Sequence, residues 1–230
     1  ASVVVTAGST SAAFQATART VASSQPVIIT AGTSPTVTTT VTVQVAQPSG
    51  LVSAYSFSEG SGTRATDVSG NGLHGTTVGT TWVDGKYGKA LSFNGSSAYV
   101  DLGRPAALNL SGSMTWSAWA YAAANPADDG QIISKSNNTN GWQLKSSPDT
   151  GPHRFGIAVS ANSKTNAQRY SNTIRSLNTW YHVAGVYDAS ARTLNIYVNG
   201  VLDNGTLVGT VPSRQSTANV NVNIGRRSGG

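Results

Sequence analysis

The sequence predicts an all-β protein in which two antiparallel sheets pack face to face. Charged residues make up only 10% of the 230 residues, whereas glycine alone contributes 25, a composition typical of short strands joined by tight turns. Apolar and polar side chains alternate over residues 154–159 and 194–199, with the period of two that marks a half-buried strand. Five Asn-Gly pairs supply the positive-φ turns that short hairpins need.

Residues 1–46 form a first part with one charged side chain, Arg19. Val37, Val41, Val43 and Val45 share one face of a segment whose other face is polar, which indicates a half-buried strand. Four strands are expected here, too few to close a core alone. They cover residues 2–6, 12–18, 27–30 and 36–45.

A linker and a second domain follow. Residues 47–50 read Gln-Pro-Ser-Gly, and proline with glycine ends a strand. The second domain is therefore expected over residues 51–230.

The second domain carries an ordered set of motifs. They read "DVSGNGLHG", "LNLSGSMTWSAWAY", "NTWYHVAGVYDASARTLNIYVNGVLDNG" and "NVNIGRR". This order resembles the laminin-G-like family of concanavalin A-like jelly rolls, and the resemblance covers residues 51–230. The first part, with "VTAGSTSAAFQATA" and "VIITAG", resembles the C-terminal half of the bacterial immunoglobulin-like spacers, whose implied function is spacing.

The family resemblance also implies how the domain ends. Its members usually continue past the "NIGRR" strand into a last strand that carries an Asp-Glu pair and lies beside the first one. We therefore expect a jelly roll that lacks its last strand, with an open sheet edge near residues 51–57. Such an edge can pair with another chain.

The loop over residues 67–75 is the expected calcium site. In the resembling family this segment often wraps a calcium ion, and calcium prefers six to eight oxygen ligands. An alternative is an Asx-type turn in which Asp67 and Asn71 only cap their own backbone. The candidate ligands are Asp67, Asn71, Gly72, His74 and Glu59.

Catalysis is not expected. Glycosidases of this kind need two carboxylates about 5 to 9 Å apart, and Glu59 is the sole glutamate, while the eight aspartates fall in turns or at strand ends. Cysteine is absent, which excludes disulfides and a thiolate nucleophile. The three histidines have no spacing typical of a triad or a zinc site.

The alternation of side chains along each strand suggests where a ligand would bind. Tyr197 and Arg154 each lie on the side of their strand that is opposite its apolar face. Together with Lys145 and Gln143, they are the candidate ligand-binding residues. Trp119 and Trp180 fall at family positions that normally pack in the core. Trp116 should face the opposite side of its strand from Trp119.

The net charge of +6 is scattered along the chain, which argues against a nucleic-acid partner. Five cations nevertheless fall within residues 145–175 and could favour acidic polysaccharides. No apolar run approaches the roughly 20 residues needed to cross a membrane.

The expected function is that of a non-catalytic carbohydrate-binding or lectin-like module in a secreted or cell-surface bacterial protein. Its partner would be a polysaccharide or a cell-surface glycan. One alternative is a protein–protein adhesion module of the same fold, and a diverged polysaccharide hydrolase or lyase is another.

Overall fold

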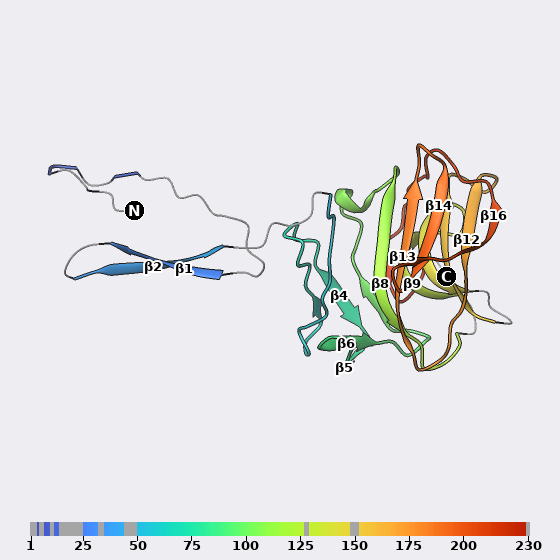
Figure 1. The fold of residues 1–230 in the computed structure, drawn as a ribbon, viewed down its shortest axis with the longest axis horizontal. Helices are drawn as coiled ribbons and strands as arrows, with labels where there is room; N and C mark the ends of the chain where they lie inside the picture. The colour runs from blue at the N-terminus through green and yellow to red at the C-terminus, as the bar shows by residue number, and fades with distance from the viewer. Residues whose placement is uncertain are drawn as a thin grey trace. The chain divides into compact units, whose positions relative to one another are not determined.

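The computed structural model describes residues 4, 7–9, 12–13, 25–31, 35–43, 50–126, 129–147 and 152–228. The chain divides into two compact units, Ala1–Leu51 and Val52–Gly230, and the described part of both is built of β-strands (Figure 1). The predicted all-β class is therefore confirmed. Within these residues, no helix has the length and apolar character that a membrane crossing requires.

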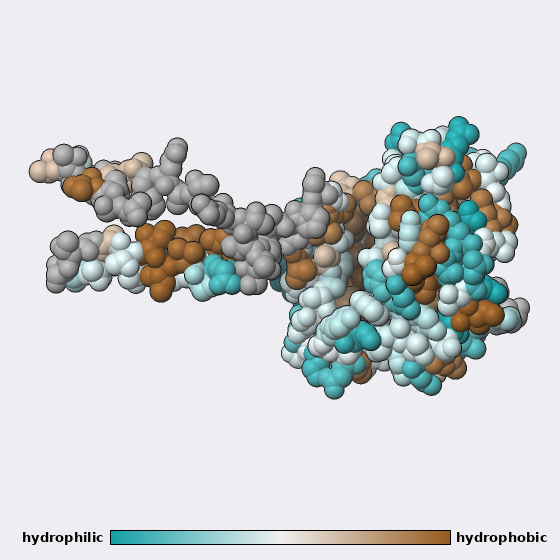
Figure 2. Space-filling model, in the orientation of Figure 1, coloured by the Kyte–Doolittle hydropathy of each residue, from teal (hydrophilic) through white to brown (hydrophobic). Residues whose placement is uncertain are grey.

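The described part of the first unit is a hairpin of β1 (Gln25–Ala31) and β2 (Val37–Val43). The valines expected to be half-buried are not all covered, because Val37 and Val41 are 71% and 48% exposed. Apolar residues accordingly colour the middle of this hairpin brown in Figure 2. A two-stranded sheet has no second layer of its own to bury them. The strands expected over residues 2–6 and 12–18 lie mostly outside the described residues, as do Val45 and most of the 47–50 linker. The immunoglobulin-like segment stays a prediction.

The second unit contains a nine-stranded and a four-stranded antiparallel sheet. The larger sheet has the order β16-β12-β11-β10-β9-β17-β7-β4-β3 and the smaller β15-β14-β13-β8, while β5 and β6 form a separate hairpin. The bounds are β3 Arg64–Ala65, β4 Gly75–Val78, β5 Thr81–Asp84, β6 Lys89–Ser92, β7 Tyr99–Asp101, β8 Met114–Tyr121, β9 Gly130–Ser136, β10 Gly141–Ser147, β11 Arg154–Ser160, β12 Asn166–Ile174, β13 Trp180–Asp188, β14 Thr193–Val198, β15 Val201–Leu202, β16 Asn204–Gly209 and β17 Asn223–Ile224. A 3-10 turn, Ala106–Leu108, follows β7.

The core lies between these two sheets. Leu144 and Ile157 of the large sheet and Leu194 and Ile196 of the small one are fully buried, as their alternation with polar neighbours predicts. The sheets approach closely at Gly185, where a Cβ atom would lie 2.4 Å from Ile157 Cγ2. The fold is thus a β-sandwich, as the sequence indicates.

The strand expected over residues 51–57 is not formed. This segment makes one isolated bridge, between Tyr55 and Asp67, and it is fixed by local hydrogen bonds instead. The Ala54 N–H donates to Asp67 Oδ1 at 3.0 Å, and the Ala54 carbonyl accepts the Val68 N–H at 2.8 Å. One end of the large sheet is therefore β3 rather than this segment, and pairing with another chain stays a prediction.

Candidate functional site

Four neighbouring strands of the large sheet carry polar side chains on the face turned away from the core. Trp142 and Leu144 of β10 point inward and are buried, so Gln143 and Lys145 point outward. Lys145 pairs with Gln131 of β9 and with Gly156 of β11, and Gly156 pairs in turn with Tyr170 of β12. One row of side chains thus crosses four strands. We name the outward residues Gln131, Gln143, Lys145, Arg154 and Tyr170 the polar face.

This row is recessed. Gln131 is only 9% exposed and Lys145 only 5%, although neither belongs to the sandwich core. A Cβ atom on Gly156 would lie 3.2 Å from Tyr170 Cδ1 and 3.6 Å from Lys145 Cγ. The glycine therefore leaves room for the tyrosine ring and the lysine stem above it.

Amide groups dominate the hydrogen bonding of the polar face. The Gln131 Nε2 donates to Gln143 Oε1 at 3.0 Å, and the Gln143 Nε2 donates to Ser136 Oγ at 3.2 Å. The Gln131 Oε1 is buried and has no partner among the described residues. A buried acceptor without a donor is costly, so this oxygen is suited to a hydroxyl donor supplied from outside.

The charged groups of the polar face are already engaged. The Lys145 ammonium forms an ion pair with the Asp129 carboxylate, and the Arg154 Nη1 donates to the carbonyl oxygens of Ser171 and Asn172. The Tyr170 hydroxyl donates to Gln168 Oε1 at 2.9 Å. The face therefore offers mainly neutral donors and acceptors.

The structure brings together three of the four expected ligand-binding residues. Gln143, Lys145 and Arg154 all lie on the polar face. Tyr197 does not, because it alternates with the buried Ile196 and Val198 on β14 and so points from the outer face of the other sheet. Sequence parity identifies the outward residues of each strand, but it does not show which sheet a strand joins.

Four of the five cations of residues 145–175 are bonded within the protein. Arg169 donates to the carbonyl oxygens of Leu194 and Gly205, each at 3.0 Å. Arg175 is buried against Ser146 Oγ and Asn125 Oδ1, and burial lowers its pKa. Lys145 and Arg154 are engaged as well, so four of the five side chains already bond to groups of the protein, and a preference of this stretch for acidic polysaccharides stays a prediction.

The loop of the expected calcium site is organised around the Asp67 carboxylate. Asp67 Oδ1 accepts the N–H groups of Ala54 and Ser69, and Oδ2 accepts the Ser69 hydroxyl and the Leu73 N–H, all at 2.8–3.0 Å. Burial alone would raise the pKa of Asp67, but these hydrogen bonds outweigh it and lower the pKa. Both oxygens are thus in use, which favours the Asx-type turn for this residue.

The other expected ligands surround the same loop. His74 Nδ1 accepts the Asp67 N–H at 3.1 Å, the Asn71 amide donates to the Val52 carbonyl at 2.9 Å, and Gly72 adopts a φ of +72°. Glu59 Oε1 accepts the Thr66 N–H at 2.5 Å. Of the described residues, no three imidazole, thiolate or carboxylate groups lie together as a metal cluster.

Calcium therefore fits this loop only in part. The Asp67 side chain does not fit as a direct ligand, because a cation at either oxygen would compete with the two hydrogen bonds that this oxygen accepts. The Glu59 Oε2 does fit, because it is buried and lacks a partner in the described part of the chain. A cation would have to use this oxygen together with carbonyl oxygens such as those of Gly72 and His74, with Asp67 holding the loop in shape.

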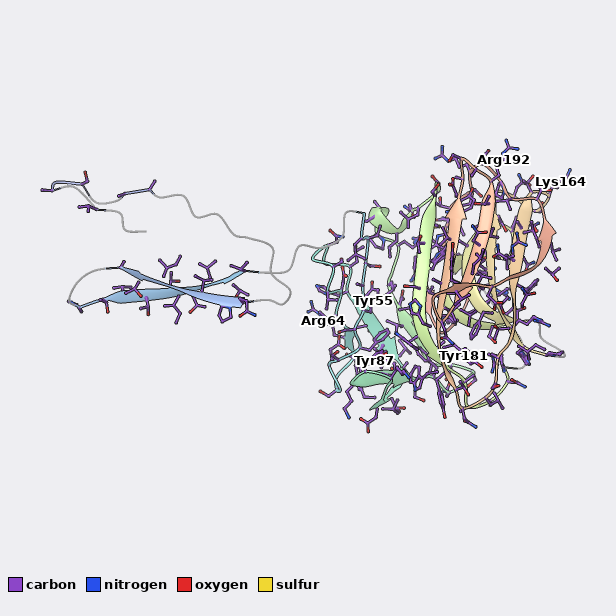
Figure 3. The ribbon with its side chains drawn as sticks, viewed as in Figure 1. Tyr55, Arg64, Tyr87, Lys164, Tyr181 and Arg192 are labelled. Carbon is purple, nitrogen blue, oxygen red and sulfur yellow. The ribbon has the colours of Figure 1, made fainter. Side chains whose placement is uncertain are left out.

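An exposed aromatic cluster lies on the outer face of the small sheet. Its members are Tyr87, Trp119, Tyr121, Trp180 and His182, which we name the aromatic face. The ring centroids are 5.5 Å apart for Tyr87 and Trp119, 5.4 Å for Trp119 and His182, and 5.3 Å for Tyr121 and Trp180. Tyr87 extends from the β5–β6 hairpin (Figure 3).

Two tryptophan assignments from the sequence are wrong. Trp119 is 41% exposed, whereas Trp116 is 6% exposed and packs on Trp142 with centroids 5.6 Å apart. Trp180 is half-buried and pairs with Tyr121 on the outer face. Because Val183 and Tyr187 point inward on β13, the even-numbered Trp180 must point outward. Only the prediction that Trp116 and Trp119 face opposite sides is confirmed.

Comparison with known proteins places this β-sandwich in a family. Residues 94–230, more than half of the sequence, match the concanavalin A-like lectin/glucanases superfamily. The chain belongs to this family, which confirms the resemblance over the larger part of residues 51–230. No curated protein matches the sequence.

Solved structures with related folds include domain 4 of AbnA, a GH43 extracellular arabinanase from Geobacillus stearothermophilus, in complex with arabinotriose. It is 21% identical, covers 71% of this chain and 78% of its own, and has a TM-score of 0.51. A native heptameric SAP-like pentraxin from Limulus polyphemus is 20% identical, with 54% and 58% covered and a TM-score of 0.37. The carbohydrate-binding module CBM66 from Bacillus subtilis is 18% identical, with 65% and 86% covered and a TM-score of 0.36.

Proposed function

We propose that the second unit is a non-catalytic carbohydrate-binding module of a secreted or cell-surface bacterial protein. The observation that carries this proposal is the polar face, where Gln131 and Gln143 form a recessed amide pair and the Gln131 Oε1 is buried with no donor among the described residues. Sugar hydroxyls are both donors and acceptors, so they can satisfy such a pair. The Tyr170 ring beside it offers a flat apolar surface to a sugar ring.

The comparison with the arabinanase domain supports the same proposal. That domain has a related fold, was solved with arabinotriose and comes from an extracellular enzyme. Binding to a polysaccharide and an extracellular location are the properties that we propose for this chain by analogy of fold. Calcium bound near Glu59 belongs to the proposal as well, in the partial form described above.

The way two of the carboxylates are used supports the non-catalytic part of the proposal. Glu59 is the sole glutamate and its Oε1 accepts a backbone hydrogen bond, while Asp129 is paired with Lys145. Both observations argue against the pair of carboxylates that a glycosidase needs. We expect no hydrolysis of neutral β-glucans above background. Turnover that disappears in Glu59→Gln would instead support a diverged hydrolase.

A glycan array with the whole chain tests the binding proposal. Gln131→Ala and Gln143→Ala should each weaken the strongest glycan signal by about tenfold, since each removes about one hydrogen bond to the ligand and disturbs its neighbour. Ser117→Ala, an exposed change on the other sheet, is the matched control and should bind like the wild type. An array without any signal would overturn the proposal.

The aromatic face favours a second candidate, protein–protein adhesion. Trp119, Tyr121 and Tyr87 are 41%, 45% and 71% exposed, and exposed tyrosine and tryptophan are enriched at the centres of protein interfaces. If adhesion were the function, Trp119→Ala would abolish attachment to a protein-coated surface while Gln131→Ala would not. The opposite pattern on glycan-coated surfaces supports carbohydrate binding.

A further inference from the structure

Lys135 is a buried cation at one end of the sandwich. It lies on β9 opposite Trp142 of β10, so its stem points to the core side of the sheet, and only 1% of the residue is exposed. Its Nζ donates to the Val220 carbonyl at 2.8 Å. An ammonium has three protons to donate, and this is the one bond it makes within the described residues.

Lys135 is also one of the residues that line a cavity. The volume of this cavity is about 420 Å³, within the ~300–1,000 Å³ range of small-molecule sites. None of the side chains that line it is acidic. The lining residues are Arg104, Asn109, Lys135, Thr217, Ala218 and Asn219.

A second cavity has one lining residue in common with the first. It has a volume of about 290 Å³ and shares Thr217 with it, and Arg214 and Gln215 are in its lining. Gln215 is fully buried, and its Oε1 has no partner in the described ranges. The linings of the two cavities together therefore include three cations, Arg104, Lys135 and Arg214, and a glutamine whose amide oxygen is unsatisfied.

Arg104 is held at the mouth of the first cavity. Its Nη1 donates to Asn219 Oδ1 at 2.6 Å and to the Asn219 carbonyl oxygen at 3.3 Å, which leaves three of the five guanidinium N–H groups, on Nε and Nη2, available for other acceptors. Burial first, and then the charge of Arg104, lower the pKa of Lys135. A bound anion would offset both effects, since it would compensate the buried charge and separate the two cations electrostatically.

We propose that this cavity binds the anionic group of an acidic sugar, a carboxylate or a sulfate ester, between Arg104 and Lys135. The inference rests on the proposed function and adds a ligand class to it. The planar guanidinium can hold two oxygens of such a group in a bidentate pair, and the lysine supplies a point charge from below. Asn109 and Thr217 line the same cavity and supply polar side chains for the hydroxyls of the sugar.

Titration of the whole chain with small ligands tests the site directly. Glucuronate, glucose and inorganic sulfate are added separately while the backbone amide NMR signals are followed. Glucuronate should shift signals of residues 104–109 and 217–219, and glucose should not. A response to sulfate with none to glucuronate would assign the site to sulfate esters, and the reverse would assign it to uronates.

Three variants locate the response. Arg104→Gln should weaken glucuronate or sulfate binding at least about tenfold, equivalent to ~1.4 kcal/mol, without affecting the fold, because Arg104 is exposed. Lys135→Met should do the same if its melting curve is unchanged. Arg64→Gln, an exposed cation on β3 (Figure 3), is the control and should bind normally. Equal affinity in the wild type and Arg104→Gln, or no shift with either anion, would overturn the inference.

The outcome is separable from that of the proposed function. If neutral glycans bind on the array, and Gln131→Ala weakens their binding while Arg104→Gln does not, the polar face is supported as the glycan site. This conclusion does not depend on whether the anions bind. If the array shows no binding but glucuronate still shifts residues 104–109 in an Arg104-dependent way, the anion site stands and the proposed function fails.

Discussion

The Tyr187 hydroxyl donates a hydrogen bond to the Pro212 carbonyl at 2.7 Å, inside the sandwich. Tyr187 is 1% exposed, and burial, followed by the charge of Asp188, raises its pKa above the ordinary value. The hydroxyl therefore stays protonated as a donor at neutral and moderately alkaline pH. This bond joins β13 to the segment that follows β16, which continues into the cavities around Thr217.

Removing this donor should destabilise the second unit measurably. Tyr187→Phe keeps the ring but leaves the buried Pro212 carbonyl unsatisfied, so we expect a loss of ~1–2 kcal/mol in the free energy of unfolding. Urea denaturation followed by tryptophan fluorescence measures it. Tyr197→Phe, on the outer face of the small sheet, is the control and should stay within ~0.5 kcal/mol. Equal midpoints for the two variants would mean that the Pro212 bond is not stabilising.

The two tryptophans of β8 should differ sharply in their effect on stability. Trp116→Ala removes a buried ring packed on Trp142, and we expect a loss of ~3–5 kcal/mol. Trp119→Ala removes a ring that is 41% exposed, and the loss should be ~1 kcal/mol or less. The same denaturation experiment compares them, and a larger loss at Trp119 would restore the assignment made from the sequence.

Local pattern predicted much of this fold, because alternation and Asn-Gly turns are local signals. The strands around Leu194 and Ile157 and the turn at Asn199 follow from them. Which sheet a strand joins depends on long-range pairing, and for that reason the alternation of side chains alone places Tyr197 with Lys145, although they lie on different sheets. The cavity beside Lys135 combines residues from 104 to 219, so no local sequence signal could have found it.

Chelation tests the proposed calcium ion. A cation that binds only the folded unit stabilises it by mass action, so a chelator should lower the melting temperature of the wild type and added calcium should restore it. Glu59→Gln should reduce the difference in melting temperature between chelator and calcium, because it removes the negative charge at the Oε2 oxygen that has no partner. Asp67→Ala should abolish it by disrupting the loop. A wild-type melting curve unchanged by chelator would exclude calcium as a stabilising ion.

The Asp67 carboxylate should make the free energy of unfolding depend on pH in the acidic range. Its pKa is lowered from 3.8 in the folded chain, so the unfolded state binds the proton more tightly and protonation favours unfolding. The contribution of Asp67 to the free energy of unfolding is therefore complete above about pH 5, where the carboxyl group of the unfolded chain is ionised as well. It is lost as the pH falls through the lowered pKa of the folded chain.

Asp67→Asn removes this titration. The variant should be less stable than the wild type at pH 7, because an amide NH₂ group would face the donors of Ser69 and Leu73, which now bond Oδ2. The difference should shrink between about pH 5 and pH 2 as the wild type loses its carboxylate. Asp84→Asn is the control, since Asp84 pairs with Lys89 while its side chain is 90% exposed, and such exposed pairs contribute little. Urea midpoints measured at one-unit pH steps provide the comparison. If the stability curves of Asp67→Asn and the wild type ran parallel over this range, the hydrogen-bonded carboxylate would not be the source of the acid sensitivity.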